Sequence, residues 1–225
     1  MAAELGRPPY AAQVTQAPTP APADGVAVRI AALCLGTLGK LSERLVCGPA
    51  VRGGLLLDLA LAGRVEQTDD SIVIDPMPIG FDPADRLLAA IGVEPERSLD
   101  AWLDEQRLGP RDVADAAVAT GRWTSRRAVV GFGRRYIDGA FDQTSADLQR
   151  DPAGPPLGWT PADAAVTAIA ATAGLLDRDL GYAMEVAPEV IAATGSAAWL
   201  STAVVEHLQS LIKQWAAEAA GLSPF

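Results

Sequence analysis

The spacing of apolar residues predicts a chain that is mostly helical. Apolar side chains recur every three or four residues from Val26 to Leu45 and again from Leu55 to Ala62, which places them on one face of a helix. Further segments show the same spacing, some behind helix-starting pairs such as Asp82-Pro83 and Thr160-Pro161. These segments are residues 82–91, 98–107, 110–119, 144–149, 160–176, 185–193 and 196–220.

Two short stretches break the helical pattern and predict β-hairpins. Residues 64–66 and 72–74 are extended runs on either side of a Thr-Asp-Asp turn. A second hairpin is predicted between Arg122 and Arg135, where the strand-like residues 128–130 have polar flanks. The predicted fold class is therefore mostly α, a helical bundle with two short β-hairpins.

The beginning of the chain differs from the rest in composition. Residues 1–25 are rich in proline and alanine, and they cannot bury enough apolar surface to offset the entropy of ordering. We predict a disordered tail there. The Pro/Gly-rich stretch 151–158 is expected to be a loop between helices that pack together. Residues 26–225 are thus predicted to form a single domain.

Composition and charge narrow the range of partners. Apolar residues make up 49% of the chain but aromatic residues only 5%, so alanine and leucine fill the interior, which favours close-packed helices. The net charge of −10 repels nucleic acid and anionic membranes as a whole. Nucleic acid is therefore not an expected partner, and any anion-binding site must be a local exception.

No pattern in the chain indicates a membrane span or an export signal. It contains no run of about 18 uncharged apolar residues, and its start lacks the basic-then-apolar order of a signal peptide. We expect a cytoplasmic protein, either free or peripheral on the inner face of the membrane. The two cysteines, Cys34 and Cys47, are too few for a disulfide framework and are expected to be buried reduced thiols.

Three segments together resemble one protein family. Val51-Arg52-Gly53-Gly54 is followed by LLLDLALAGRV, a leucine-rich helix that ends at Gly-Arg before a hairpin. Residues 98–105 (SLDAWLDE) have a central tryptophan, and residues 120–135 include a glycine that ends a helix before the second hairpin. In order and spacing these segments resemble the GPP34 (Golgi phosphoprotein 3-like) family, and from about residue 26 to 220 the chain looks like a bacterial member.

The resemblance implies a fold and a function. The family has a helical bundle surrounded by amphipathic helices and loops, with β-hairpins. Its eukaryotic members bind the phosphate of phosphatidylinositol 4-phosphate in a basic pocket, insert an apolar hairpin tip into the bilayer and capture cytoplasmic tails of Golgi enzymes. By resemblance we expect a protein that binds phosphoinositide-type headgroups.

Arg52 matches the pocket arginine of the family's Arg-Gly-Gly motif, whereas Glu43 stands where the family has a tryptophan. Gly53 and Gly54 are expected to leave backbone N–H groups uncovered at a helix N-terminus, which would favour an anion beside Arg52. The alternative is that Arg52 pairs with a nearby carboxylate, such as that of Asp58 or Glu43.

The family's other pocket arginines are only partly present. They lie three residues apart on the helix before the second hairpin. Arg107 falls near the first position, Pro110 occupies the second, and Arg111 is one residue away. We take Arg107 and Arg111 as candidate headgroup-binding residues.

The predicted second hairpin carries the concentrated basic stretch of this acidic chain. Arginine suits phosphate because its planar fork donates two parallel hydrogen bonds. With apolar residues Val129, Val130 and Phe132 at the predicted tip, the hairpin has the composition of a loop that dips into a membrane. The alternative is a set of solvated arginines that flank a core strand. The arginines are Arg122, Arg126, Arg127, Arg134 and Arg135.

Catalytic and metal-binding patterns are scarce. His207 is the single histidine and is expected to be a satisfied or surface side chain. Asp69-Asp70 invites comparison with the aspartate-rich motif of isoprenoid enzymes, but its position between two strands favours a turn. Phosphate-binding glycine loops and paired zinc-ligand spacings do not occur. We predict no catalytic residue, no metal site and no cofactor.

Three functional hypotheses remain open. The first is a peripheral module that binds anionic phospholipid headgroups. The second is a repurposed enzyme of specialised metabolism that acts on a phosphorylated small molecule or an isoprenoid diphosphate, with the arginines on the phosphates. The third is an adaptor that binds a partner protein and neither ligand.

Overall fold

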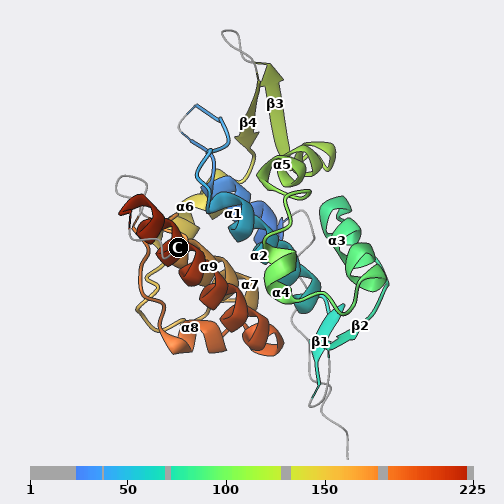
Figure 1. Cartoon of the computed structure of the whole chain (residues 1–225). Helices are drawn as coiled ribbons and strands as arrows, with labels where there is room; N and C mark the ends of the chain where they lie inside the picture. Colours follow the sequence, from blue (N-terminus) through green and yellow to red (C-terminus); the bar gives the residue numbers. More distant parts are fainter. Residues whose placement is uncertain (1–23, 37, 69–71, 128–132, 177–181, 222–225) are drawn as a thin grey trace, which may run out of the picture.

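The computed structural model describes residues 24–36, 38–68, 72–127, 133–176 and 182–221. Helix α2 (Cys47–Leu61) is buried along nearly its whole length, because α1 (Val26–Leu33), α7 (Pro161–Thr172) and α9 (Ala198–Ala219) pack against it. Figure 1 shows these helices together in the bundle. The mostly α fold is confirmed.

Shorter helices and two hairpins complete the described fold. Helices α3, α4 and α5 pack against α2, whereas α6 and α8 pack against α7. Among the described residues both sheets are two-stranded and antiparallel. The elements are β1 (Val65–Gln67), β2 (Ile72–Ile74), α3 (Asp82–Val93), α4 (Leu99–Leu103), α5 (Pro110–Ala119), β3 (Trp123–Arg127), β4 (Arg134–Asp138), α6 (Phe141–Gln149), α8 (Pro188–Ala192) and the 3-10 turn η2 (Gly195–Ala197).

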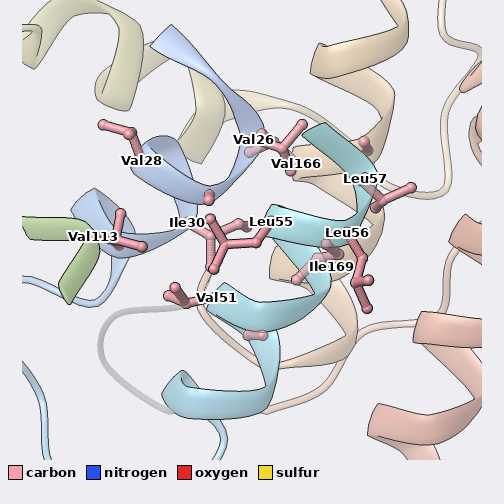
Figure 2. Close-up of a cluster of buried hydrophobic side chains, with 14 of the residues drawn as sticks. Val26, Val28, Ile30, Val51, Leu55, Leu56, Leu57, Val113, Val166 and Ile169 are labelled. Atoms are coloured by element: carbon pink, nitrogen blue, oxygen red, sulfur yellow. The ribbon is translucent and has the colours of Figure 1, made fainter. Parts of the chain in front are cut away.

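Small residues allow the central helices to approach closely. A Cβ on Gly54 would lie 2.8 Å from the Cα of Ala27 on α1, and a Cβ on Gly53 would lie 2.5 Å from Cγ1 of Val204 on α9. Around this contact lie branched aliphatic side chains such as Ile30, Leu55 and Ile169 (Figure 2). The glycines of the Arg-Gly-Gly motif therefore let α1 and α9 pack closely against α2.

Two sequence-based boundaries were wrong. The helix predicted from Val26 to Leu45 ends at Leu33, because the chain turns back so that the Gly36 amide donates to the Lys40 carbonyl at 2.9 Å, and Gly39 adopts a φ of 69°. The next helix begins at Cys47 rather than near Leu55.

Most other predicted elements are confirmed. The predicted bounds of α5 match, and Thr160 caps α7 as expected. Ser98 caps α4, but this helix ends at Leu103 rather than near residue 107. Asp82 is the first residue of α3 rather than its N-cap, a position that Phe81 holds. Both hairpins form, but the strands of the second are the predicted polar flanks, Trp123–Arg127 and Arg134–Asp138. The predicted strand-like residues 128–130 lie outside the described part of the chain, as do residues 69–71.

The structure describes only the last two residues of the predicted tail. Of residues 1–25, the structure describes Asp24 and Gly25, and Gly25 is buried. Across the described ranges, no helix has both the length and the apolar character needed to cross a membrane.

Candidate functional site

The β3–β4 hairpin stands on a buried aromatic base. Trp123 and Tyr136 are 1% and 4% exposed, and their ring centroids are 6.2 Å apart at a tilt of 57°. Strand alternation puts both rings on the face that packs on the body, beside α5. Trp123 is therefore a core residue. From this base the two strands extend away from the bundle (Figure 1).

Arginines face one another across the outer half of the hairpin. Arg126 pairs with Arg135 in the antiparallel register, and Arg127 pairs with Arg134. Like charges at directly opposed positions destabilise a two-stranded sheet. The hairpin therefore carries a concentration of positive charge that its own pairing does not favour.

One carboxylate holds this hairpin on α5. Oδ1 of Asp115 accepts hydrogen bonds from Nη1 of Arg134 and from the hydroxyl of Tyr136, each at 2.8 Å. Burial and this hydrogen bond raise the pKa of Tyr136, and the bond to Asp115 raises the pKa of Arg134. Nε of Arg111 lies 4.0 Å from the other oxygen of Asp115. The structure thus brings Arg111 of the predicted headgroup set to the hairpin arginines.

The remaining hairpin arginines have no acidic partner among the described residues. Arg126, Arg127 and Arg135 form no ion pair there, and Arg126 and Arg127 are exposed. We call Arg111, Arg126, Arg127, Arg134 and Arg135 the hairpin cluster. Of these five arginines, Arg134 and Arg111 lie beside the carboxylate of Asp115, and the other three have no acidic partner among the described residues. The predicted apolar tip residues Val129, Val130 and Phe132 lie outside the described residues.

Arg52 lies inside the protein. The residue is 6% exposed, and its guanidinium donates from Nη1 to the Leu108 carbonyl at 2.9 Å and from Nε to the Leu103 carbonyl. Burial lowers the pKa of Arg52 in spite of the nearby carboxylates of Asp104 and Glu105. Neither carboxylate partner considered from the sequence, Asp58 or Glu43, pairs with it; Arg52 instead fixes the loop after α4.

The predicted helix N-terminus at Gly53 and Gly54 was wrong. Because α2 begins at Cys47, both glycines lie inside the helix, where their N–H groups belong to the helical ladder. They do not present free amides to an anion. Their role in the structure is the close approach of α1 and α9.

Arg107 lies at the surface in mixed-charge surroundings. Its side chain is 88% exposed, and Nε is 3.9 Å from Oε1 of Glu105. A shallow hollow there is also lined by Asp104 and Arg97, and Arg97 pairs with Glu105 at 3.1 Å. Arg52, Arg107 and Arg111 therefore occupy three different environments: the interior, this hollow and the hairpin cluster.

Arg122 points away from the hairpin cluster, into a cavity at the base of β3. The cavity, of about 720 Å³, lies beside α1, α6 and the start of α7, and Arg29, Phe141 and Asp163 also line it. Nε of Arg122 is 2.8 Å from Oδ1 of Asp24 but lacks hydrogen-bond geometry.

A buried ionic network beside this cavity was not foreseen from the sequence. Asp147 is fully buried, and Oδ2 accepts from Nε of Arg29 at 3.0 Å while Oδ1 accepts from Arg150. Nη2 of Arg29 donates to Oδ1 of Asp163 at 2.7 Å. The network joins α1, α6 and α7. Arg29 lies more than 100 residues from Asp147 and from Asp163 along the chain, so local spacing gives no signal for the link that it makes.

His207 is satisfied, as the sequence indicates. Its ring nitrogens lie 2.8 Å from Asp100 and 3.1 Å from Asp104, both of which belong to the α4 segment. Over the described part of the chain, no three His, Cys, Asp or Glu side chains gather in a way that could hold a metal ion. Asp69 and Asp70 lie outside the described residues.

The fold and its surfaces define a class of protein: a helical bundle that carries two small hairpins, one of them bearing paired arginines. The family model for Golgi phosphoprotein 3 (GPP34) matches residues 33–220. The chain therefore belongs to the GPP34 family. A comparison with curated proteins gives no match.

Proposed function

We propose that this protein binds anionic phospholipid headgroups at the cytoplasmic face of a membrane through the hairpin cluster. Membership of the GPP34 family supports a role related to phosphoinositide binding. The observation that carries the proposal is the pairing of Arg126 with Arg135 and of Arg127 with Arg134 on a projecting hairpin, where Asp115 is the single acidic partner within the described structure.

Local charge offsets the acidity of the whole chain. Each arginine near an anionic surface contributes on the order of 1 kcal/mol. Repulsion from acidic groups farther than about 8 Å is largely screened at physiological ionic strength. Because the hairpin extends from the bundle (Figure 1), its arginines can meet a surface ahead of the acidic body. The apolar sequence of residues 128–132 between the strands suits the same contact.

The proposal assigns the headgroup phosphates to the hairpin cluster rather than to Arg52. Nε and Nη1 of Arg52 already donate hydrogen bonds to the backbone carbonyls of Leu103 and Leu108. Arg111 is the member of the predicted pocket set that lies beside the cluster. The proposal includes capture of a partner protein by the same membrane-bound module.

Vesicle sedimentation tests the proposal. We expect binding to phosphatidylcholine vesicles that contain phosphatidylinositol 4-phosphate or phosphatidylserine and much weaker binding to phosphatidylcholine alone. The double variant Arg126→Gln, Arg135→Gln removes two charges, worth about 2 kcal/mol, so binding should weaken roughly 30-fold. The matched control Arg86→Gln, Lys213→Gln removes the same charge from exposed sites elsewhere. Equal binding by both double variants would exclude the hairpin cluster as the lipid site.

The cavity beside Arg122 supports a second candidate, the binding of a phosphorylated small molecule. Its volume of about 720 Å³ suits a small ligand, and it combines Arg29 and Arg122 with apolar Leu61 and Phe141. Calorimetric titration with a prenyl diphosphate, with and without Mg²⁺, tests binding, and product analysis tests turnover. Arg122→Gln should abolish this binding and leave vesicle binding intact. An absence of heat and product in every titration removes this candidate.

A further inference from the structure

The two cysteines of the chain meet at the junction of α1 and α2. Cys34 directly follows the last residue of α1, and Cys47 is the first residue of α2. Both residues are buried, at 2% and 1% exposure, and each thiol lies near enough to act on the pKa of the other. The structure holds them as free thiols. Two neighbouring thiols at the junction of a packed helix pair are placed to react with each other.

The surroundings of Cys47 favour its thiolate. The hydrogen bond with Cys34 lowers the pKa of Cys47 and burial raises it, while the Ser42 hydroxyl and the Arg44 guanidinium lower it, and the net direction is downward. The position at the start of a 15-residue helix adds the positive end of the helix dipole. For Cys34, the hydrogen bond with Cys47 and burial raise the pKa. The position of Cys47 at the start of α2 makes it the thiol suited to attack, with Cys34 beside it to resolve.

We propose that Cys34 and Cys47 are a redox modification site, which a hydroperoxide oxidises to a reversible intramolecular disulfide. The Cys47 thiolate attacks one peroxide oxygen and the O–O bond breaks, which leaves a sulfenic acid and releases an alcohol, or water from hydrogen peroxide. The Cys34 sulfur then displaces the sulfenic oxygen as water. In sum, two thiols lose two electrons and two protons, and the peroxide gains both.

The contact between the sulfurs determines the product. A sulfenic acid with a thiol beside it condenses to a disulfide, whereas an isolated one proceeds to sulfinic acid. The bond would close the segment 35–46, in which the chain already turns back so that the Ser42 amide donates to the Cys34 carbonyl at 2.8 Å. The same segment contacts β4, because the Tyr136 amide donates to the Gly39 carbonyl at 2.8 Å. The inference does not depend on lipid binding by the hairpin.

Peptide mapping tests the proposal on the full-length protein. Reduced protein is treated with hydrogen peroxide, blocked with an alkylating agent, digested with trypsin and examined by mass spectrometry. Cleavage after Arg29, Lys40, Arg44 and Arg52 places Cys34 in peptide 30–40 and Cys47 in peptide 45–52. We expect these two peptides joined by a disulfide that dithiothreitol separates, and an intact protein lighter by two hydrogen atoms.

The order of the two steps and the need for the fold are tested separately. In a Cys34→Ser variant, dimedone should trap a sulfenic acid on Cys47. The wild type unfolded in urea, which needs no folded variant, should form the bond several-fold more slowly than the native protein because the thiols are no longer in contact. Sulfinic acid at either cysteine of the native protein, a disulfide between two chains, or equal rates in native and unfolded protein would overturn the proposal.

Discussion

The carboxylate of Asp58 on α2 caps the first turn of α1: its Oδ1 lies 2.6 Å from the backbone nitrogen of Val26. Its Oδ2 accepts from the Ala27 amide at 3.0 Å. The cap thus comes from the helix against which α1 packs, rather than from the residue before α1. Gly25 makes room for it, because a Cβ there would lie 2.6 Å from Oδ1. Two orphan amides of α1 are satisfied in this way.

The Asp58 cap makes stability depend on pH. Burial raises the pKa of Asp58 from 3.8 to about 7, against the opposing effect of the two backbone hydrogen bonds. Between these values the folded state binds more protons than the unfolded state, so the free energy of unfolding falls as pH rises. We expect this loss to develop from about pH 4 and to level off above about pH 7.

Other carboxyl groups titrate over the same range, so the quantity measured is the difference in the free energy of unfolding between the wild type and a variant without this carboxyl group. Urea denaturation is followed at several pH values for the wild type and for Asp58→Asn, which cannot ionise at this site. The wild type should lose stability relative to the variant as pH rises through the window. A difference that stays constant, or that grows in the opposite direction, contradicts the assigned pKa.

The close contact of α1 with Gly54 predicts that adding one methyl group at this position strongly lowers the stability of the fold. In Gly54→Ala the new Cβ meets the Ala27 backbone at 2.8 Å, so the helices must separate. Overpacking costs about 1–3 kcal/mol, and alanine returns up to about 1 kcal/mol in helix propensity. We expect a net loss of about 2 kcal/mol in denaturant unfolding.

Gly92→Ala is the matched control for Gly54→Ala. Gly92 also lies within a helix, but a Cβ there meets no atom within 4 Å. This variant should gain roughly 0.5–1 kcal/mol. If both variants change stability alike, close helix contact does not explain the glycine in the motif.

The sequence predicted the elements better than it predicted what the Arg-Gly-Gly motif does. Helical spacing predicted both ends of α5, and short extended runs predicted the two hairpins. In these elements the local propensities favour the same structure as the tertiary fold. Helical spacing missed the start of α2 at Cys47, since Gly48-Pro49 resembles a break although proline is tolerated in a first helical turn. That error moved Gly53 and Gly54 to a helix end and suggested free amides.

The buried guanidinium of Arg52 gives a prediction about stability. Arg52→Ala leaves the Leu103 and Leu108 carbonyls without their donor in a buried setting. An unsatisfied buried acceptor costs about 1–3 kcal/mol, so we expect a loss of about 3 kcal/mol by thermal or urea unfolding.

Arg107→Ala is the comparison for Arg52→Ala, because its side chain is 88% exposed. It should stay within about 0.5 kcal/mol of the wild type. Vesicle binding by the folded fraction of Arg52→Ala should equal that of the wild type under the proposal for the hairpin cluster. A stable Arg52→Ala variant that has lost lipid binding would return the headgroup site to Arg52.

The arginines of the hairpin site could be predicted from the sequence, because they are close neighbours along the chain. Their pairing follows from a hairpin register, and Arg126, Arg127 and Arg134 were candidates for that reason. The role of Asp115 could not be predicted, since it comes from α5 and meets Tyr136 only through tertiary packing. Arg122 belongs to the same run of sequence, yet its side chain turns into the cavity below the hairpin.

The ionic network at Asp147 should be the most sensitive polar site of those discussed. Its carboxylate is fully buried and bonds to Arg29 and to Arg150, so Asp147→Ala would leave Asp163 as the one remaining carboxylate paired with both guanidinium groups among the described residues. Removing one partner of a buried ion pair costs about 3–5 kcal/mol, much of a small domain's stability. Asp142→Ala is the control: it lies on the same helix, is exposed, and should change stability by less than about 0.5 kcal/mol. Urea denaturation of the two variants decides the point, and an Asp147→Ala loss no larger than that of Asp142→Ala would mean that packing around α1, α6 and α7 holds these helices without the charge pair.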